Sequence, residues 1–229
     1  MLSAGLWAFL AASSLIVGAY VALHFNVSRQ RVGEAMGFGA GAMLGALAYE
    51  LIPNSHVSDV QVWLSFGVGS VVFYALDTLV ERGASGGNVG RTIALGALLD
   101  GIPESMVLGM SLAVGGSVSI GFLVAVFVSN VPEALSATSA MVQPTSKQNP
   151  YKVWILIVLI SAFAGAAGYA IANWAPAADG RYVQAFAGGA VLTMLASSMM
   201  PEAFEEGGRV IALLTALGFA IAAVLTTLD

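Results

Sequence analysis

Charged residues are scarce in this chain, and cysteine is absent. Of its 229 residues, 58% are hydrophobic and only 9% are charged, whereas an ordinary soluble domain is about one quarter charged. This composition excludes a soluble globular protein and predicts an integral membrane protein. The lack of cysteine excludes disulfides and thiolate metal sites, and the absence of a basic cluster argues against a nucleic-acid partner.

Long hydrophilic segments are also missing, so we expect one all-α transmembrane transporter domain over residues 1–229. A spanning helix needs about 20 mainly apolar residues, because lipid offers the backbone no hydrogen-bond partners. Eight segments meet this requirement and predict an eight-helix bundle. They lie roughly at 4–25, 32–53, 59–82, 89–114, 116–142, 150–174, 182–203 and 205–227. The first lacks the positively charged start of a secretory signal, so we expect it to span the membrane.

Lysine and arginine are unevenly distributed between the two sets of predicted loops. The loops after the first, third, fifth and seventh helices contain Arg29, Arg31, Arg82, Arg91, Lys147, Lys152 and Arg209. The opposite loops contain only Arg181. Because short cytoplasmic loops are enriched in positive charge, we expect both termini outside, with the protein in a plasma membrane such as the inner membrane of a bacterium.

Two segments of the chain align over their full length without a gap. They are GFGAGAMLGALAYELIP at 37–53 and AFAGGAVLTMLASSMMP at 185–201. The predicted second and seventh helices cross the membrane in opposite directions, so we expect an inverted repeat that relates helices 1–3 to helices 6–8. Such repeats are typical of secondary transporters. Helices 4 and 5 are expected to pair at the centre, because DGIPES at 100–105 parallels SNVPEA at 129–134.

Three acidic residues fall at mid-depth in the predicted spans. Asp100 and Glu104 lie four residues apart, on one helix face, and Glu133 lies at comparable depth on the next helix. A charged carboxylate at a helix centre costs about 2.5–3.5 kcal/mol on insertion. Pro103 and Pro132 each remove a backbone amide and free a carbonyl oxygen four residues earlier. Carboxylates and freed carbonyls together predict a cation site.

No lysine, arginine or histidine lies at the predicted midplane, so an internal salt bridge is excluded. The acids must therefore carry protons or bind a cation. One alternative is a pair of protonated acids that only hydrogen-bond between helices. The doubled proline-glutamate motif favours a divalent ion, which would displace the protons when it binds.

These motifs resemble those of the ZIP family of divalent metal transporters. The resemblance covers nearly the whole chain: the eight helices, the glycine-rich second helix, the two proline-glutamate motifs and the seventh helix ending in MMPEAFEEGG. It implies a metal site formed by Met43, Asp100, Glu104 and Glu133, with the two glutamates able to bridge to a second ion. The family motif usually starts His-Asn, whereas this chain has Asp100 and Gly101.

The departures from the family pattern fall mainly on the second ion. Ser129 and Asn130 fit the fifth-helix motif, with Asn130 at a ligand position, but Gly101 replaces an amide ligand and Ser198 stands where the family often has a carboxylate. The resemblance therefore implies one well-formed site and a weak or missing second one. With Asp100 in place of histidine, an oxygen-dominated site would accept Mn²⁺, Fe²⁺ or Cd²⁺ besides the family's Zn²⁺.

Other polar residues lie near the predicted mouths. Glu50, His56 and Asp59 could gather ions at the outer entrance, although exposed loop polarity explains His56 and Asp59 equally well. Glu202 could assist release at the cytoplasmic side, although a solvated charged loop is the simpler interpretation.

We expect a transporter that moves a divalent cation into the cytoplasm by alternating access, not an enzyme. The cation is its substrate, and no prosthetic group is expected. No nucleotide-binding Gly-Lys-Ser/Thr motif is present, and both histidines lie at membrane edges, away from any metalloprotease motif. Two alternatives stay open: a proton-coupled carrier of a small solute, and a metal-selective channel. The small-residue face GAGAMLGALA at 39–48 could pack within the bundle or between the subunits of a homodimer.

Overall fold

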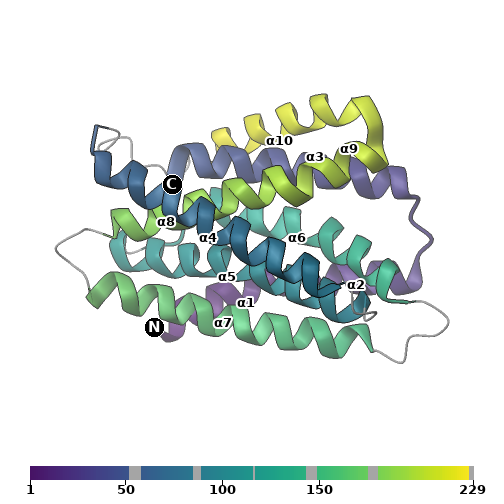
Figure 1. Ribbon diagram of the computed structural model, residues 1–229, viewed down its shortest axis with the longest axis horizontal. Helices are drawn as coiled ribbons and strands as arrows, with labels where there is room; N and C mark the ends of the chain where they lie inside the picture. The colour runs from purple at the N-terminus through teal and green to yellow at the C-terminus, as the bar shows by residue number, and fades with distance from the viewer. Residues whose placement is uncertain (52–57, 85–88, 116, 143–148, 175–179, 227–229) are drawn as a thin grey trace.

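The structure is a computed structural model that describes residues 1–51, 58–84, 89–115, 117–142, 149–174 and 180–226. Nearly all of these residues are helical, and the described ranges contain no strand. The long helices lie side by side in one bundle (Figure 1). This arrangement confirms the all-α prediction. Within the described ranges, six helical stretches are long and apolar enough to cross a membrane, which indicates an integral membrane protein.

The helices follow one another with short connections. In chain order they are α1 (Leu2–Ala12), α2 (Ser14–His24), α3 (Arg29–Ala46), the π-helix η1 (Leu47–Leu51), α4 (Val60–Ala84), α5 (Val89–Gly115), α6 (Ile120–Met141), α7 (Pro150–Trp174), α8 (Arg181–Met194), the π-helix η4 (Leu195–Met199), α9 (Met200–Gly207), the 3-10 turn η5 (Gly208–Val210) and α10 (Ile211–Leu225). The predicted end of the seventh helix at 203 is too early, because α9 continues to Gly207. The chain then turns at Gly208, where φ is 69° and glycine is favoured.

The structure yields six candidate spans where eight were predicted, for two reasons. Glycines together with Arg29, Arg31 and Glu34 make α3 less apolar than the other helices. The stretch Arg181–Leu225 runs through α8, α9 and α10 and counts as one candidate of 45 residues, about twice the length that a bilayer requires. The finer division into eight spans stays a prediction.

Packing divides the helices into two groups. α1, α2, α5, α6 and α7 contact one another and form what we call the α5–α6 group. α3, α4, α8, α9 and α10 form the α3–α8 group, in which α3 packs on α9 and α10, and α4 packs on α8. In Figure 1, α10, α3 and α9 lie along the upper side of the bundle, and α7 lies along the lower side. The groups meet where α3 contacts α6 and where α5 contacts α4 and α8.

Contacts inside each group are close. In the α5–α6 group, a Cβ atom on Gly109 of α5 would lie 1.9 Å from the carbonyl oxygen of Gly165 on α7. The buried indole nitrogen of Trp154 donates a hydrogen bond to Thr138 Oγ1 over 2.8 Å, which joins α7 to α6. Small residues let membrane helices approach until their backbones touch. Each group is therefore held by contacts that leave little room for sliding.

Helices α3 and α10 pack against each other through glycine. A Cβ on Gly41 of α3 would lie 2.0 Å from the carbonyl oxygen of Thr215, and a Cβ on Gly218 of α10 would lie 2.1 Å from that of Phe38. No larger side chain fits at either position. The small-residue face at 39–48 is thus used inside the chain, against α10.

Helices α4 and α8 show the same kind of packing. A Cβ on Gly69 of α4 would lie 1.9 Å from the carbonyl oxygen of Phe186, and a Cβ on Gly189 of α8 would lie 2.0 Å from that of Phe66. Ser70 Oγ also donates a hydrogen bond to the carbonyl oxygen of Gly189 over 3.1 Å. Each of the two pairs, α3 with α10 and α4 with α8, is therefore tightly packed.

Two π-helical turns follow helices of the α3–α8 group. η1 follows α3, and η4 follows α8. In the sequence, each is followed two residues later by a proline, Pro53 and Pro201. Proline cannot donate to the carbonyl four residues back, here Tyr49 and Ser197, and these two residues lie within the π-helices. A π-turn is wider than an α-helical turn and is one way for a helix to accommodate the missing hydrogen bond. Such π-turns often lie at functional sites.

Candidate cation site

A small cavity lies where the two helix groups meet. Its polar lining comes from Asp100 on α5, Glu133 on α6, Ser198 on η4 and Glu202 on α9. The cavity volume is about 30 Å³, enough for one or two species the size of a water molecule. The structure thus places two of the three predicted mid-depth acids in one space, together with an acid that was predicted only at the exit.

The helices α5 and α6 bring the two acids to the cavity from the same group. Each helix continues through its internal proline, Pro103 or Pro132. Both carboxylates are half-buried. The side-chain ion pairs recorded among the described residues join Arg29 to Glu206 and Arg181 to Asp59, and neither involves the cavity. Within the described ranges, no ion pair therefore compensates the charge of the cavity acids.

Glu104 lies beside the cavity, not in its lining. It is buried, with 2% of its surface exposed, and lies one helical turn beyond Asp100 on α5. Its carboxyl group is close enough to those of Asp100 and Glu133 for the charges to interact. In the described part of the chain, no three side chains among aspartate, glutamate and histidine come close enough to hold a metal ion. Any ion in this cavity would need ligands of another kind.

Methionine completes the lining. Met36 on α3, Met194 on α8 and Met199 on η4 all border the cavity. Met43, the methionine that the family resemblance implied as a ligand, is fully buried in the hydrophobic core and does not border the cavity. Met36 lies seven residues before Met43, so both lie on nearly the same face of α3, two turns apart. The family resemblance thus implied a methionine on the face of α3 that borders the cavity, but two turns away from the methionine that the structure places there.

The remaining fifth-helix residues have packing roles here. Ser129 Oγ donates a hydrogen bond to the carbonyl oxygen of Val126 over 3.0 Å, and the Ser129 Cα lies 2.8 Å from where a Cβ on Gly39 would stand. Asn130 is buried, with 4% of its surface exposed. Neither Ser129 nor Asn130 borders the cavity. Ser129 lies where α6 packs on α3.

One hydrogen bond crosses between the groups at the cavity. Ser136 Oγ on α6 donates to Glu202 Oε1 on α9. Ser136 lies three residues after Glu133, so its hydroxyl and the Glu133 carboxylate share a face of α6. Sequence reasoning missed Ser136, because a single serine in an apolar helix has no distinguishing pattern. This bond fixes the carboxylate of Glu202 at the border of the cavity.

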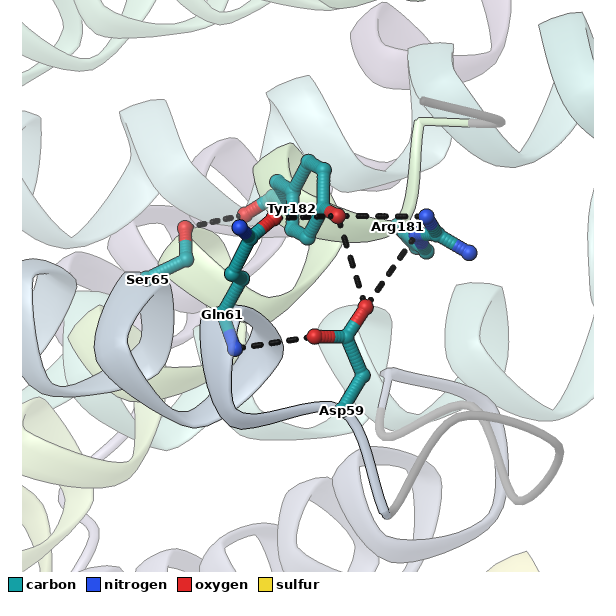
Figure 2. Close-up of polar contacts among 5 residues, drawn as sticks. All are labelled: Asp59, Gln61, Ser65, Arg181 and Tyr182. Atoms are coloured by element: carbon teal, nitrogen blue, oxygen red, sulfur yellow. Dashed lines mark hydrogen bonds and ion pairs between the residues drawn. The ribbon is translucent and has the colours of Figure 1, made fainter. Parts of the chain in front are cut away.

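Asp59 lies in a different setting, shown in Figure 2. Its Oδ1 accepts a hydrogen bond from the Gln61 backbone amide over 2.9 Å, and its Oδ2 lies 3.8 Å from Arg181 Nε. The hydroxyl of Tyr182 lies 2.8 Å from Gln61 Oε1 and 3.3 Å from Asp59 Oδ2. Ser65 Oγ donates to the carbonyl oxygen of Tyr182 over 2.6 Å. We call these five residues the outer clamp, because they join the start of α4 to the start of α8.

The other predicted entrance residues are placed only in part. Glu50 on η1 is half-buried, and its Oε1 lies 2.8 Å from where a Cβ on Gly121 would stand, at the N-terminus of α6. A helix N-terminus favours a negative charge, which gives Glu50 a structural reason to lie there. His56 lies outside the described residues.

Comparison of the chain with models of known protein families and with curated proteins finds no match. The fold and the site define the class: an integral membrane protein, helical in the described ranges, with a small cavity between two helix groups that is lined by three acidic residues, three methionines and one serine.

Proposed function

We propose that this protein is a transporter of the ZIP type that moves a divalent metal cation into the cytoplasm. The observation that carries the proposal is that Asp100 and Glu133, from two proline-containing helices, line one cavity inside the bundle. Uncompensated carboxylates in such a place are costly and are usually functional. A dication offsets both charges at once and fits a volume of about 30 Å³.

The size of the cavity also favours a metal ion over an organic solute. Sites for drug-sized or cofactor-sized molecules measure about 300–1,000 Å³, roughly ten times the volume found here. A proton-coupled carrier of an organic solute would need a larger space than the one beside these acids. A metal-selective channel and a carrier can be distinguished by measuring whether uptake saturates as the cation concentration rises.

The structure supports an inverted repeat, the construction expected of such a transporter. The π-helices η1 and η4 begin at Leu47 and Leu195, which are the same position of the aligned segments 37–53 and 185–201. The packing of α3 against α9 also agrees with an inverted repeat, because the two helices run antiparallel. A Cβ on Gly33 near the start of α3 would lie 2.6 Å from the Gly207 amide at the end of α9.

The glycine contacts repeat in the same way. Phe38 and Phe186 are aligned, and each presents its carbonyl oxygen to a glycine, Gly218 on α10 and Gly69 on α4. The pair α3–α10 therefore matches the pair α8–α4. This match supports the division of the chain into eight spans, in which α8 with α9 and α10 count separately.

The position of the cavity suggests how transport proceeds. Asp100 and Glu133 belong to the α5–α6 group, and the rest of the lining, including Glu202, belongs to the α3–α8 group. A movement of one rigid group against the other would open the cavity first to one side and then to the other. The ion would shed water onto Asp100 and Glu133 and leave past Glu202. An inside-negative potential would draw a dication inward by about 4.6 kcal/mol per 100 mV.

Uptake into proteoliposomes tests this proposal. We expect saturable uptake of Zn²⁺ or Cd²⁺ by the full-length protein, lost in both Asp100→Ala and Glu133→Ala. Glu205→Ala is the matched control, because Glu205 is exposed on α9 and does not border the cavity. Full uptake in both cavity variants would overturn the assignment of the site, and uptake that never saturates would favour the channel.

A further inference from the structure

We infer that the three methionines of the cavity set its cation preference, so that the site takes a soft or borderline divalent cation such as Cd²⁺ in preference to a hard one such as Mn²⁺. This inference rests on the proposed function and names its substrate class. It also departs from the sequence, which predicted an oxygen-dominated site that tolerates manganese.

The cavity has two chemically different walls. The α5–α6 group provides the carboxylates of Asp100 and Glu133, and the α3–α8 group provides three methionines together with one serine and one glutamate: Met36, Met194, Met199, Ser198 and Glu202. The three methionines are almost completely buried, with 1%, 3% and 4% of their surfaces exposed. An ion held by Asp100 and Glu133 would therefore lie in a cavity that three methionines border from the other helix group.

The described residues leave an ion few alternatives to sulfur. Three acids border the cavity, but in the described ranges no three acidic or histidine side chains lie close enough together to hold a metal ion, and a bound metal needs about four ligands or more. The carboxylate of Glu202 already accepts a hydrogen bond from Ser136. Mn²⁺ prefers oxygen ligands in octahedral number, whereas thioether sulfur suits softer metals. Two carboxylates facing thioethers therefore suit a soft ion better.

The π-helix η4 explains how two of these methionines reach the same cavity. Met194 and Met199 are five residues apart, which in an α-helix would place them on different faces. A π-turn carries the i to i+5 relation instead, and η4 spans Leu195–Met199. The methyl group of Met199 is held beside α3, 3.2 Å from where a Cβ on Gly39 would stand.

The competing explanation is that these methionines only fill space, as methionine often does in cores. Leucine has nearly the same volume, so a Met→Leu change preserves packing at small cost and removes the sulfur. The chain provides matched controls for this substitution. Met110 on α5 and Met141 on α6 are both fully buried and do not border the cavity.

Binding titrations on the purified full-length protein test the inference. Cd²⁺ and Mn²⁺ have the same charge and similar size, so their affinity ratio reports ligand softness. We expect Met36→Leu, Met194→Leu and Met199→Leu each to lower Cd²⁺ affinity about tenfold and to change Mn²⁺ affinity less than about twofold. Met110→Leu and Met141→Leu should leave both affinities unchanged. X-ray absorption at the cadmium edge of the unmodified protein should show sulfur in the first coordination shell.

The outcomes separate this inference from the proposed function. If Cd²⁺ binding depends on Asp100 and Glu133 but the affinity ratio ignores all three methionines and the absorption spectrum shows only oxygen, the inference is wrong and the transporter proposal stands. If neither ion binds, or if binding survives Glu133→Ala, the proposed function itself fails.

Discussion

Acidic side chains have different surroundings inside a helix group and between the groups. Inside the α3–α8 group, glycines press backbones together, and Asp59 of the outer clamp has an arginine, a tyrosine hydroxyl and a backbone amide around it. Between the groups, Asp100 and Glu133 face a cavity whose other walls are largely thioethers. Acids that the protein satisfies itself are structural, and acids left without a protein counter-charge are candidates for ligand binding.

The largest expected effect is a loss of cation uptake without a loss of stability, at the interface between the groups. Asp100→Asn and Glu133→Gln should lower cation uptake about 100-fold. The same changes should leave the melting temperature of the metal-free protein equal or higher, because each replaces a half-buried carboxyl group, which has no ion-pair partner in the described ranges, with a neutral amide. Uptake assays and thermal unfolding in detergent measure the two effects. A large loss of stability with normal uptake would contradict this prediction.

Inside a group, we expect a substitution to lower the stability of the protein. Gly69→Ala should destabilise the protein by about 1–3 kcal/mol, because the new Cβ would lie 1.9 Å from the carbonyl oxygen of Phe186. Gly67→Ala, on the same helix, is the control, since nothing lies within 4 Å of its Cβ. Gly218→Ala should match Gly69→Ala if the chain is an inverted repeat. Thermal unfolding of the three variants shows whether glycine packing is as tight as the structure indicates.

Hydrophobic runs and loop residues predicted much of this fold. α7 has the predicted bounds 150–174, because its long apolar run is bounded by polar residues on both sides. The end of the seventh helix was misplaced, since Glu202, Glu205 and Glu206 look like a solvated loop. In the structure they extend the helix, and a glycine at positive φ ends it.

The candidate site could be predicted in part. The paired proline motifs led to Asp100 and Glu133, because one motif occurs twice at equal depth. The methionines could not be found in this way. Their meeting depends on a π-turn that shifts the helical register and on the rotation of α3 against α8, and local sequence encodes neither. The partners of Asp59 were hidden for a similar reason, since Tyr182 lies 123 residues away in the chain.

The outer clamp supplies the next test. Asp59 precedes α4, and its carboxylate accepts a hydrogen bond from the Gln61 amide, so Asp59→Ala should cost about 1 kcal/mol of stability as a lost helix cap. Cation uptake should change less than about twofold at any concentration. Asp59→Asn should retain most of the stability, because asparagine caps nearly as well. If Asp59 instead gathers ions at the entrance, both variants would raise the cation concentration needed for half-maximal uptake.

The smallest expected effect falls on the bond that joins the two groups. Ser136 donates to Glu202 across the interface, and a hydrogen bond to a charged group contributes about 1.5–3 kcal/mol, but here both side chains are only half-buried. Breaking it should therefore change the balance between transport states more than the stability of either group. Ser136→Ala should change the maximal uptake rate about two- to fivefold, with the melting temperature nearly constant, and Ser136→Thr should restore the rate by keeping the hydroxyl. If Ser136→Ala lowered the melting temperature as strongly as Gly69→Ala does, the bond would belong to the rigid packing, and the boundary between the moving groups would have to be drawn elsewhere.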